Sequence, residues 1–476
     1  MKKTVVLYPG VGVGHLVPMV ELAKVFLKHG LAVTVALVEP PDGSATFSAA
    51  VARTKASNPS VTFHVLPPPP PAPPAAPADE AAPNHHVIKI FQFLAAMNAP
   101  LRDFLRSLPS VHALVLDMFC VEAQDVAEEL SLPVYYFYAS AASDLAVFLN
   151  LPSKLAGMDK KVKELGDSMM SFPGVPPFKA SDLPSEVSND GVALGSILRM
   201  FERMPASDGI LINSFESLEA RAVRALKDGL CVPSHATPPV YCIGLLVSGG
   251  GDKEHGCIRW LDAQPDKSVV FLSFGSMGTF SKKQLGEIAI GLENSGERFL
   301  WVVRNPPNSD HKFGDPIPEM EDLDTLLPDG FLERTKDRGL VVKSWAPQVD
   351  VLRHRATGAF VTHCGWNSTL EGITAGLPLL CWPMYAEQRV NKVHIVEEFK
   401  LGVEMRGYNE EVVKAEEVET KVRWVMESEG GKALRERVEA AKSAAAEALK
   451  EGGSSHIAFV QFLEDLDASK VQTVQG

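Results

Sequence analysis

The sequence predicts an α/β fold made of two Rossmann-like domains, and three observations indicate it. Short apolar runs alternate with longer amphipathic stretches along the whole chain, which is the pattern of βα units in a parallel sheet. The 476 residues are too many for one ordinary core and indicate two domains of roughly 200–250 residues each. The alternation starts again after the glycine-rich residues 248–252, which predicts a flexible boundary there.

The expected strands are short apolar runs, six in each half of the chain. They are predicted at residues 4–8, 31–38, 61–66, 111–116, 134–137 and 209–212, and then at 269–273, 299–303, 340–343, 358–362, 378–382 and 402–405. Helices are predicted between them, for example at 16–28, 282–294, 433–450 and 456–466. The proline-rich residues 67–83 and the acidic residues 305–329 predict two surface loops.

Composition excludes several classes of protein. The chain carries 46 basic and 59 acidic residues, and this net charge of −13 argues against a nucleic-acid partner or an anionic membrane surface. The apolar residues 134–149 are interrupted by Ser140, Ser143 and Asp144, so we expect a buried strand and helix rather than a membrane span. Six irregularly spaced cysteines and the lack of a signal peptide before the first strand predict reduced thiols in a cytoplasmic protein, which we expect to be a monomer.

The turn after the first strand reads G-V-G-V-G-H at 10–15 and has two interpretations. One is a dinucleotide-binding fingerprint, with Glu39 at the end of the second strand as the acid that binds ribose, which would make the chain an oxidoreductase. His15, however, stands where the third glycine of that fingerprint should allow close packing. An imidazole can accept a proton near neutral pH, so we favour His15 as a general base for a hydroxyl nucleophile.

Asp117 is the residue expected to support that base. A protonated imidazole is stabilised by a carboxylate, which also selects the ring tautomer. Asp117 follows the strand predicted at 111–116, at the carboxyl edge where open α/β sheets bind ligands. An ordinary turn or helix-cap aspartate is the alternative interpretation of this position.

A second group of functional residues lies between Trp345 and Gln388. The strand at 358–362 leads to His363 and Asn367, and a helix is expected to open at about Ser368. Unpaired N–H groups at a helix N-terminus attract anions, and a cationic or donor-bearing His363 would add to this attraction. The segment therefore predicts a site for a nucleotide sugar.

These 44 residues closely resemble the plant secondary product glycosyltransferase box of family 1 UDP-sugar-dependent glycosyltransferases. The matching positions are W-A-P-Q at 345–348, H-C-G-W-N-S at 363–368, Glu371, Gly376, Pro378, Pro383 and E-Q at 387–388. The resemblance implies the GT-B fold, in which two Rossmann-like domains face each other across a cleft. It further implies an acceptor-binding domain at 1–247, a UDP-sugar-binding domain at 248–455, and a C-terminal helix and tail at 456–476 that crosses back to the first domain.

The resemblance also assigns roles to individual residues. Trp345 would stack on uracil, Gln348 and Glu371 would bind ribose, and Glu387 with Gln388 would bind the sugar, although Glu371 also has capping-box spacing from Ser368. The complete set of expected donor contacts is Ser276, Trp345, Ala346, Gln348, His363, Trp366, Asn367, Ser368, Glu371, Tyr385, Glu387 and Gln388. Trp366 is expected to present its backbone and indole edge to the sugar, and Gln388 with Trp366 favours UDP-glucose. Candidates for the acceptor pocket, which could equally be core residues, are Met118, Phe119, Tyr138, Phe148 and Phe201.

The resemblance, together with the His15–Asp117 pair, implies an inverting enzyme that transfers glucose from UDP-glucose to a flavonoid or another small plant phenolic. A β-O-glucoside is favoured, with a C-linked product as the alternative. We expect no cofactor and no bound metal, because the only D-x-D sequences, at 322–324 and 465–467, lie in an acidic loop and in the tail. Two other interpretations stay open, namely a dinucleotide-dependent oxidoreductase and a non-catalytic UDP-sugar-binding protein.

Overall fold

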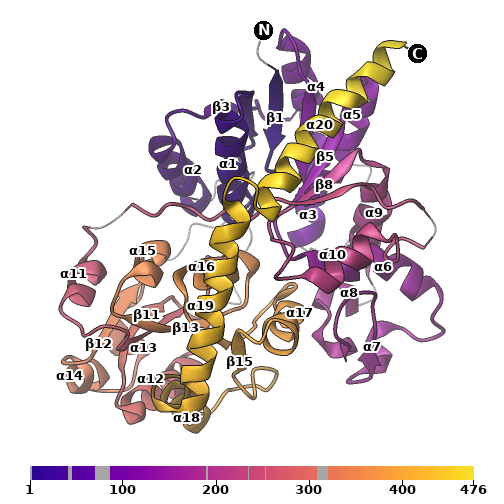
Figure 1. Ribbon diagram of the computed structural model, residues 1–476. Helices are drawn as coiled ribbons and strands as arrows, with labels where there is room; N and C mark the ends of the chain where they lie inside the picture. The colour runs from indigo at the N-terminus through magenta and orange to yellow at the C-terminus, as the bar shows by residue number, and fades with distance from the viewer. Residues whose placement is uncertain are drawn as a thin grey trace, which may run out of the picture. The chain divides into compact units, whose positions relative to one another are not determined.

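The computed structural model describes residues 3–40, 45–69, 86–188, 191–233, 235–251, 254–307 and 320–475. The chain divides into two compact units (Figure 1). Unit 1 contains the described residues up to Leu246 together with those from Ala448 onward, and unit 2 contains the described residues from Val247 to Glu447. The C-terminal helix therefore belongs to the same unit as the N-terminal sheet.

Unit 1 is built on a parallel sheet that has seven strands within the described ranges, in the order β3-β2-β1-β4-β5-β8-β9. These strands are β1 (Thr4–Tyr8), β2 (Ala32–Leu37), β3 (Thr62–Val65), β4 (Ala113–Asp117), β5 (Val134–Tyr138), β8 (Gly209–Ile212) and β9 (Val240–Cys242). The direction of the strand order reverses between β1 and β4. Open α/β sheets bind ligands at such a reversal, beyond the carboxyl ends of the two strands.

Helices cover this sheet and connect its strands. They are α1 (Val13–Lys28), α2 (Ala45–Ser57), α3 (His86–Ala96), α4 (Asn98–Ser107), α5 (Gln124–Glu129), α6 (Ala142–Ala156), α7 (Val162–Leu165), α8 (Ser185–Ser188), α9 (Val192–Arg203) and α10 (Ala220–Lys227). Three short 3₁₀ helices, η1 (Met118–Ala123), η2 (Ala180–Asp182) and η3 (Met204–Ala206), and a small antiparallel ribbon of β6 (Met169–Met170) and β7 (Phe178–Lys179) complete the described part of the unit.

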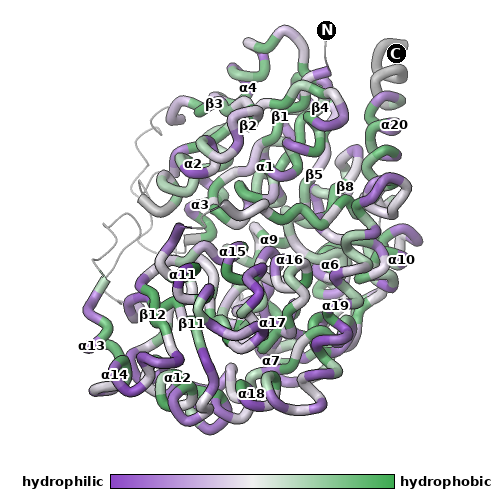
Figure 2. The backbone as a smooth tube through the Cα atoms, turned by 60° about the vertical axis from the view of Figure 1, so that its left-hand side comes forward, coloured by the Kyte–Doolittle hydropathy of each residue, from purple (hydrophilic) through white to green (hydrophobic). Residues whose placement is uncertain are grey.

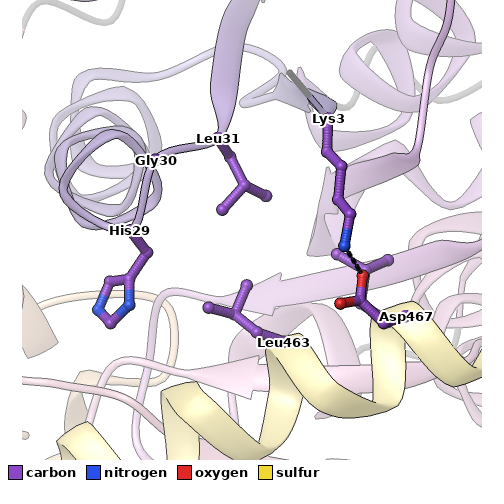
Figure 3. Close-up of a pocket in the computed structure, with 7 residues that line it drawn as sticks. Lys3, His29, Gly30, Leu31, Leu463 and Asp467 are labelled. Atoms are coloured by element: carbon purple, nitrogen blue, oxygen red, sulfur yellow. Dashed lines mark hydrogen bonds and ion pairs between the residues drawn. The ribbon is translucent and has the colours of Figure 1, made fainter. Parts of the chain in front are cut away.

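The last helix, α20 (Ser454–Gln475), belongs to unit 1 (Figure 1). It packs there through aromatic side chains. The Phe462 ring makes edge contacts with Phe26 of α1, Tyr135 of β5 and Tyr241 of β9. Farther along α20, Asp467 forms an ion pair with Lys3 at the rim of a cavity of about 320 Å³ (Figure 3). The C-terminal helix thus completes the hydrophobic core over the N-terminal sheet.

Unit 2 contains a second parallel sheet, with six strands in the described residues and the order β12-β11-β10-β13-β14-β15. The strands are β10 (Val269–Ser273), β11 (Arg298–Val303), β12 (Gly339–Lys343), β13 (Thr357–Thr362), β14 (Leu379–Cys381) and β15 (Gly402–Glu404). Here the order reverses between β10 and β13, so a ligand site is expected beyond those two strands.

The helices of unit 2 alternate with its strands. They are α11 (Gly256–Asp262), α12 (Lys282–Ser295), α13 (Leu323–Leu326), α14 (Phe331–Thr335), α15 (Gln348–Arg353), α16 (Trp366–Ala375), α17 (Gln388–Val393), the π-helical η4 (His394–Glu398), α18 (Ala415–Glu427) and α19 (Glu429–Leu449). Within the described ranges no helix of the chain is both long and apolar enough to cross a membrane.

The central strands are buried on both faces, as parallel sheets covered by helices require. Val270 and Leu272 of β10 pack into one core cluster of unit 2, whereas Val269 and Phe271 pack into the other, because alternate side chains of a strand point to opposite faces. In unit 1, hydrophobic segments, green in Figure 2, follow the neighbouring strands β1 and β4. This burial holds the loops at the carboxyl ends of the strands in place.

The α/β class with two Rossmann-like sheets is confirmed, and the twelve predicted strands all occur. The structure corrects several details. It adds β9 and the β6–β7 ribbon, it begins α1 at Val13 rather than Leu16, and it begins α16 at Trp366 rather than Ser368. The proline-rich loop at 67–83 lies outside the described residues from 70 onward, as does the acidic loop between 308 and 319, while α13 occupies part of that second loop.

Candidate active site

His15 and Asp117 are joined at the point where the strand order of unit 1 reverses. His15 lies in the first turn of α1, directly after β1, and Asp117 is the last residue of β4. The His15 Nδ1 atom lies 2.7 Å from Asp117 Oδ2. An ionised carboxylate only accepts hydrogen bonds, so Nδ1 carries the proton and Nε2 is the basic nitrogen of the ring.

Asp117 has two roles, one for each oxygen. Its Oδ1 atom accepts a hydrogen bond from the Phe119 backbone N–H at 3.0 Å and so caps η1, while Oδ2 receives His15. The cap and the dyad, which the sequence presented as alternatives, therefore occur together. The Asp117 side chain is 1% exposed and that of His15 is 25% exposed, so the carboxylate is fixed in the core and the imidazole reaches the surface of unit 1.

The early start of α1 explains how His15 is held. Gly12 is the N-cap at φ +116°, a conformation that residues with a side chain rarely adopt, and the helix begins at the next residue. The backbone N–H of His15 then donates to the Gly12 carbonyl at 3.2 Å. His15 is thus anchored on a helix rather than on a loop, and its ring, paired with Asp117, occupies the place that a dinucleotide fingerprint reserves for glycine.

Aromatic rings lie next to the dyad. The Phe119 ring contacts the His15 ring edge-on at 5.0 Å between centroids, and Phe91 of α3 contacts Phe119 at 5.8 Å. Phe119 is half-buried, as is Met118. Three other predicted pocket residues are deeper, since Tyr138 is 0%, Phe201 2% and Phe148 6% exposed, and their rings pack on one another. Burial assigns Tyr138 and Phe201 to the core.

The donor-side residues of unit 2 surround the β10–β13 reversal, and Gln348 connects several of them. Its Oε1 atom accepts from the Ser273 hydroxyl at 2.8 Å, and its Nε2 atom donates to Ser368 Oγ at 2.8 Å and to Glu371 Oε2 at 2.7 Å. Burial raises the pKa of the Glu371 carboxyl to about 7. Gln348, the first residue of α15, therefore connects the end of β10 with the first turns of α16.

The capping-box spacing of Ser368 and Glu371, which was the alternative interpretation of Glu371, does not form a cap in the structure. Helix α16 begins at Trp366 with Gly365 as its N-cap, and the cap makes no side-chain hydrogen bond. Ser368 is consequently inside the first turn, and both Ser368 and Glu371 interact with Gln348 instead of with the helix terminus. The Trp366 indole does not have the exposed edge that was expected of it, because this side chain is 2% exposed and lies against Phe399. Asn367, which follows it, is half-buried in the same turn.

His363 is neutral rather than cationic. Its side chain is buried, and burial, helped by the charge of Arg304, lowers the pKa of the imidazole to about 4. Its Nδ1 atom has no hydrogen-bond partner among the described residues. The opposite nitrogen, Nε2, faces two glycines, since a Cβ atom on Gly275 or on Gly365 would lie 2.5 Å from it. The imidazole thus supplies hydrogen bonding, not charge, to the glycine-lined space.

Trp345 has the exposure that a stacking platform requires. It is 43% exposed, although tryptophan is normally well buried. Its ring is nearly perpendicular to that of His255, and the two ring centroids are 5.8 Å apart. Ala346, the next residue, is buried in the core under it. Ser276 is exposed in the turn that follows β10.

The two residues at the end of the box differ in their surroundings. Gln388 is 3% exposed, and its Oε1 atom accepts from the backbone N–H groups of Met384 at 2.9 Å and Tyr385 at 3.0 Å. The Glu387 carboxylate accepts a hydrogen bond from Asn391 Nδ2 at its Oε1 atom, at 3.4 Å. Gln388 therefore shapes the turn that carries Tyr385 and Glu387.

Sequence reasoning missed two residues at this edge of the sheet. Ser273, the last residue of β10, supports Gln348, and Arg304, directly after β11, donates from Nη1 to the Gly275 carbonyl. Both positions immediately follow or end a predicted strand at the carboxyl edge, which was the available signal. No group of three or more His, Cys, Asp or Glu side chains in the described part of the chain is arranged to hold a metal ion.

These features, two parallel-sheet units with a His–Asp pair on one and a nucleotide-sugar box on the other, define a GT-B glycosyltransferase. Comparisons with known proteins agree with this class. The family model described as "UDP-glucoronosyl and UDP-glucosyl transferase" matches residues 213–436. The anthocyanidin 5,3-O-glucosyltransferase of a Rosa hybrid cultivar is 42% identical over 471 residues, covering 95% of this chain and 96% of the relative. The chain therefore belongs to the plant family 1 UDP-glycosyltransferases.

Solved structures give the same result. A Phytolacca americana glycosyltransferase, complexed with UDP-2-fluoro-glucose and pterostilbene, is 33% identical with a TM-score of 0.84 and covers 98% of this chain and 100% of its own. A Polygonum tinctorium UDP-glucosyltransferase capable of glucosylating indoxyl, in complex with 3,4-dichloroaniline, is 34% identical with a TM-score of 0.86, covering 98% and 99%. None of these relatives favours the alternative interpretation of the chain as a dinucleotide-dependent oxidoreductase.

Proposed function

We propose that this enzyme transfers glucose from UDP-glucose to the hydroxyl of a small phenolic acceptor, most simply a flavonoid, with inversion to a β-O-glucoside. The single observation that carries the proposal is the hydrogen bond of 2.7 Å between His15 Nδ1 and Asp117 Oδ2. It orients a basic nitrogen in the first turn of α1, and a UDP-sugar-binding protein without catalysis has no use for it.

In the proposed reaction, His15 Nε2 removes the proton of the acceptor hydroxyl while the oxygen attacks the anomeric carbon. The bond between that carbon and the diphosphate oxygen breaks, and its electron pair leaves with UDP. Asp117 stabilises the imidazolium that forms, and its second hydrogen bond, to the Phe119 N–H, keeps the carboxylate from turning away. One displacement on an α-linked donor gives a β-linked product.

We assign donor binding to unit 2 and acceptor binding to unit 1. The exposed face of Trp345 stacks on uracil, and the half-buried Glu371 with Gln348 binds the ribose hydroxyls. His363 and the N-terminal N–H groups of α16 receive the diphosphate, because a helix N-terminus attracts anions. The remaining contacts are proposed for Ser276, Ala346, Trp366 through its backbone, Asn367, Ser368, Tyr385, Glu387 and Gln388.

The phenolic class of acceptor rests on the apolar surroundings of His15 and on the relatives. Phe119, which contacts the His15 ring, and Phe91, which contacts Phe119, offer aromatic surface near the base, and Met118 precedes Phe119 in the chain. We include Phe148, which stacks on Phe201, as a deeper residue of the proposed pocket. The names and ligands of the relatives, anthocyanidin, pterostilbene, indoxyl and dichloroaniline, are all flat aromatic compounds. We further propose that the enzyme works as a cytoplasmic monomer and needs no metal.

The test is product detection by mass spectrometry. The purified protein is mixed with EDTA, with UDP-glucose, UDP-galactose or UDP-glucuronic acid, and with a panel of flavonoids, simple phenols and aliphatic alcohols. We expect a mass gain of one hexose on phenols with UDP-glucose, and fragmentation that releases the intact sugar, as O-glycosides do. Retained cross-ring fragments would identify a C-glycoside instead, and UDP-sugar binding without any product would refute the catalytic proposal.

A further inference from the structure

Arg304 is a partly buried cation that no carboxylate in the described part of the chain neutralises. It directly follows the last residue of β11, and its Nη1 atom donates to the carbonyl oxygen of Gly275. Burial lowers the pKa of its guanidinium, and the neighbouring Tyr385 hydroxyl is what offsets this effect. Removing a cation from water without a counter-charge costs free energy, so an anion is expected to compensate it in the working protein.

The surroundings of Arg304 are those of the donor site. Gly275, whose carbonyl Arg304 holds, has φ +74° and lies against the imidazole of His363 on its other side. Arg304 is also close enough to His363 to lower the pKa of that ring further than burial alone does. The guanidinium and the imidazole therefore converge on one glycine turn, directly beyond β10, at the strand-order reversal of unit 2.

These groups differ in the charge they can offer. His363 has a pKa of about 4 and is neutral at physiological pH, with its buried Nδ1 atom lacking a partner within the described residues. The N-terminus of α16 offers only partial charges. Arg304 is the group among them that carries a full positive charge. Its fork of N–H donors, of which the Gly275 carbonyl takes one, matches the oxygens of a phosphate group.

We propose that Arg304 binds the diphosphate of the UDP-sugar and stabilises the negative charge that gathers on UDP as it leaves. This inference rests on the proposed donor site and adds a charged residue to it that lies outside the nucleotide-sugar box. A fixed guanidinium in a shielded site acts most strongly where charge develops, which is on the oxygen that keeps the electron pair of the broken bond.

The experiment compares uridine with UDP by isothermal titration calorimetry, in the wild type and in the variants R304Q, R304A, R304K and R298Q. Arg298 is the matched control because it begins β11, whereas Arg304 follows the other end of the same strand. In R304Q we expect UDP to bind roughly ten- to a hundredfold more weakly while uridine binds as in the wild type. The UDP affinity of R304Q should also depend less steeply on salt, since one ion pair is lost. R298Q should match the wild type throughout.

The outcomes are distinguishable. UDP binding by R304Q that equals the wild type, or a loss that is the same for uridine and UDP, would overturn the inference, the second because Arg304 would then only support the Gly275 turn. If R304Q does not fold, R304A decides the question, with a lowered UDP-to-uridine affinity ratio supporting the contact and an unchanged ratio refuting it. R304K keeps the charge but not the fork of donors, so it should retain more UDP affinity than the neutral variant. A wild-type protein that binds no UDP would refute the proposed donor site itself.

Discussion

Replacing Asp117 with Asn isolates the contribution of its charge, because the two side chains have almost the same shape. Asp117 is 1% exposed and serves His15 with one oxygen and the Phe119 N–H with the other. Asparagine has a single oxygen. If that oxygen stays with Phe119, the amide N–H₂ faces His15 and forces the proton onto Nε2, so the ring can no longer act as a base. If the amide turns over, its N–H₂ group opposes the Phe119 N–H.

The expected loss of activity follows from two free-energy costs. Losing a hydrogen bond to a charged group costs about 1.5–3 kcal/mol, and leaving a buried donor without an acceptor costs about 1–3 kcal/mol. Together they amount to about 2.5–6 kcal/mol in the transition state, which corresponds to a fall in kcat of roughly 10² to 10⁴.

The assay is the initial rate of glucosylation of a phenolic substrate at saturating UDP-glucose, together with UDP affinity by calorimetry. The control variant is D208N, which also replaces an aspartate of unit 1 that accepts a backbone hydrogen bond, in this case from Val134 at 2.8 Å, but is exposed. We expect D117N to lose kcat with unchanged UDP affinity and D208N to behave as the wild type. A kcat for D117N within threefold of the wild type would refute the role of the dyad.

Three further variants test other parts of the account. H15A should lower kcat by roughly 10² to 10⁴ and leave UDP affinity nearly unchanged, and near-normal O-glucosylation would remove His15 from the role of base. Burial raises the pKa of Glu371 to about 7, so the carboxyl is increasingly protonated as pH falls below that value, and a protonated carboxyl is the poorer acceptor for ribose hydroxyls. Uridine affinity should therefore rise with pH and level off above about 8. The variant E371Q should abolish this pH dependence. A wild-type uridine affinity that does not change with pH would contradict the ribose contact. Q388H should lower the rate with UDP-glucose relative to UDP-galactose and lower the total rate as well, since two backbone N–H groups lose their acceptor, whereas an unaltered donor ratio would mean that the sugar is recognised elsewhere.

The sequence predicted the sheets well because a parallel sheet covered by helices leaves strong local signals. Strands buried on both faces read as continuous apolar runs, so β8 and β10 were located to the residue. The short edge strand β9 was missed because its three residues are too few to form a pattern. Its place depends on pairing with β8, which is a tertiary contact.

The start of α16 was misplaced for a different reason. Ser368 and Glu371 have the spacing of a capping box, but the helix begins at Trp366, and its N-cap, Gly365, makes no side-chain hydrogen bond. The serine and the glutamate are instead recruited by Gln348, from a helix twenty residues earlier in the chain. Local spacing cannot reveal that a distant side chain competes for the same groups.

The charge states of the site residues could not be predicted from the sequence either. His363 was expected to be cationic or to act as a donor, and burial together with Arg304 excludes the cationic alternative near neutral pH. Which residue carries the positive charge depends on how deeply each side chain is buried and on what lies beside it. The pairing of His15 with Asp117, in contrast, was predictable, since both follow central strands at the same edge of one sheet.

The most direct test of the central claim is the anomeric configuration of the product, determined by proton NMR on a glucoside made from UDP-glucose. A single displacement assisted by His15 requires inversion, so we expect the large coupling constant of a β-glucoside at the anomeric proton. An α-glucoside, with its small coupling constant, would mean that the reaction proceeds with net retention and would contradict the mechanism.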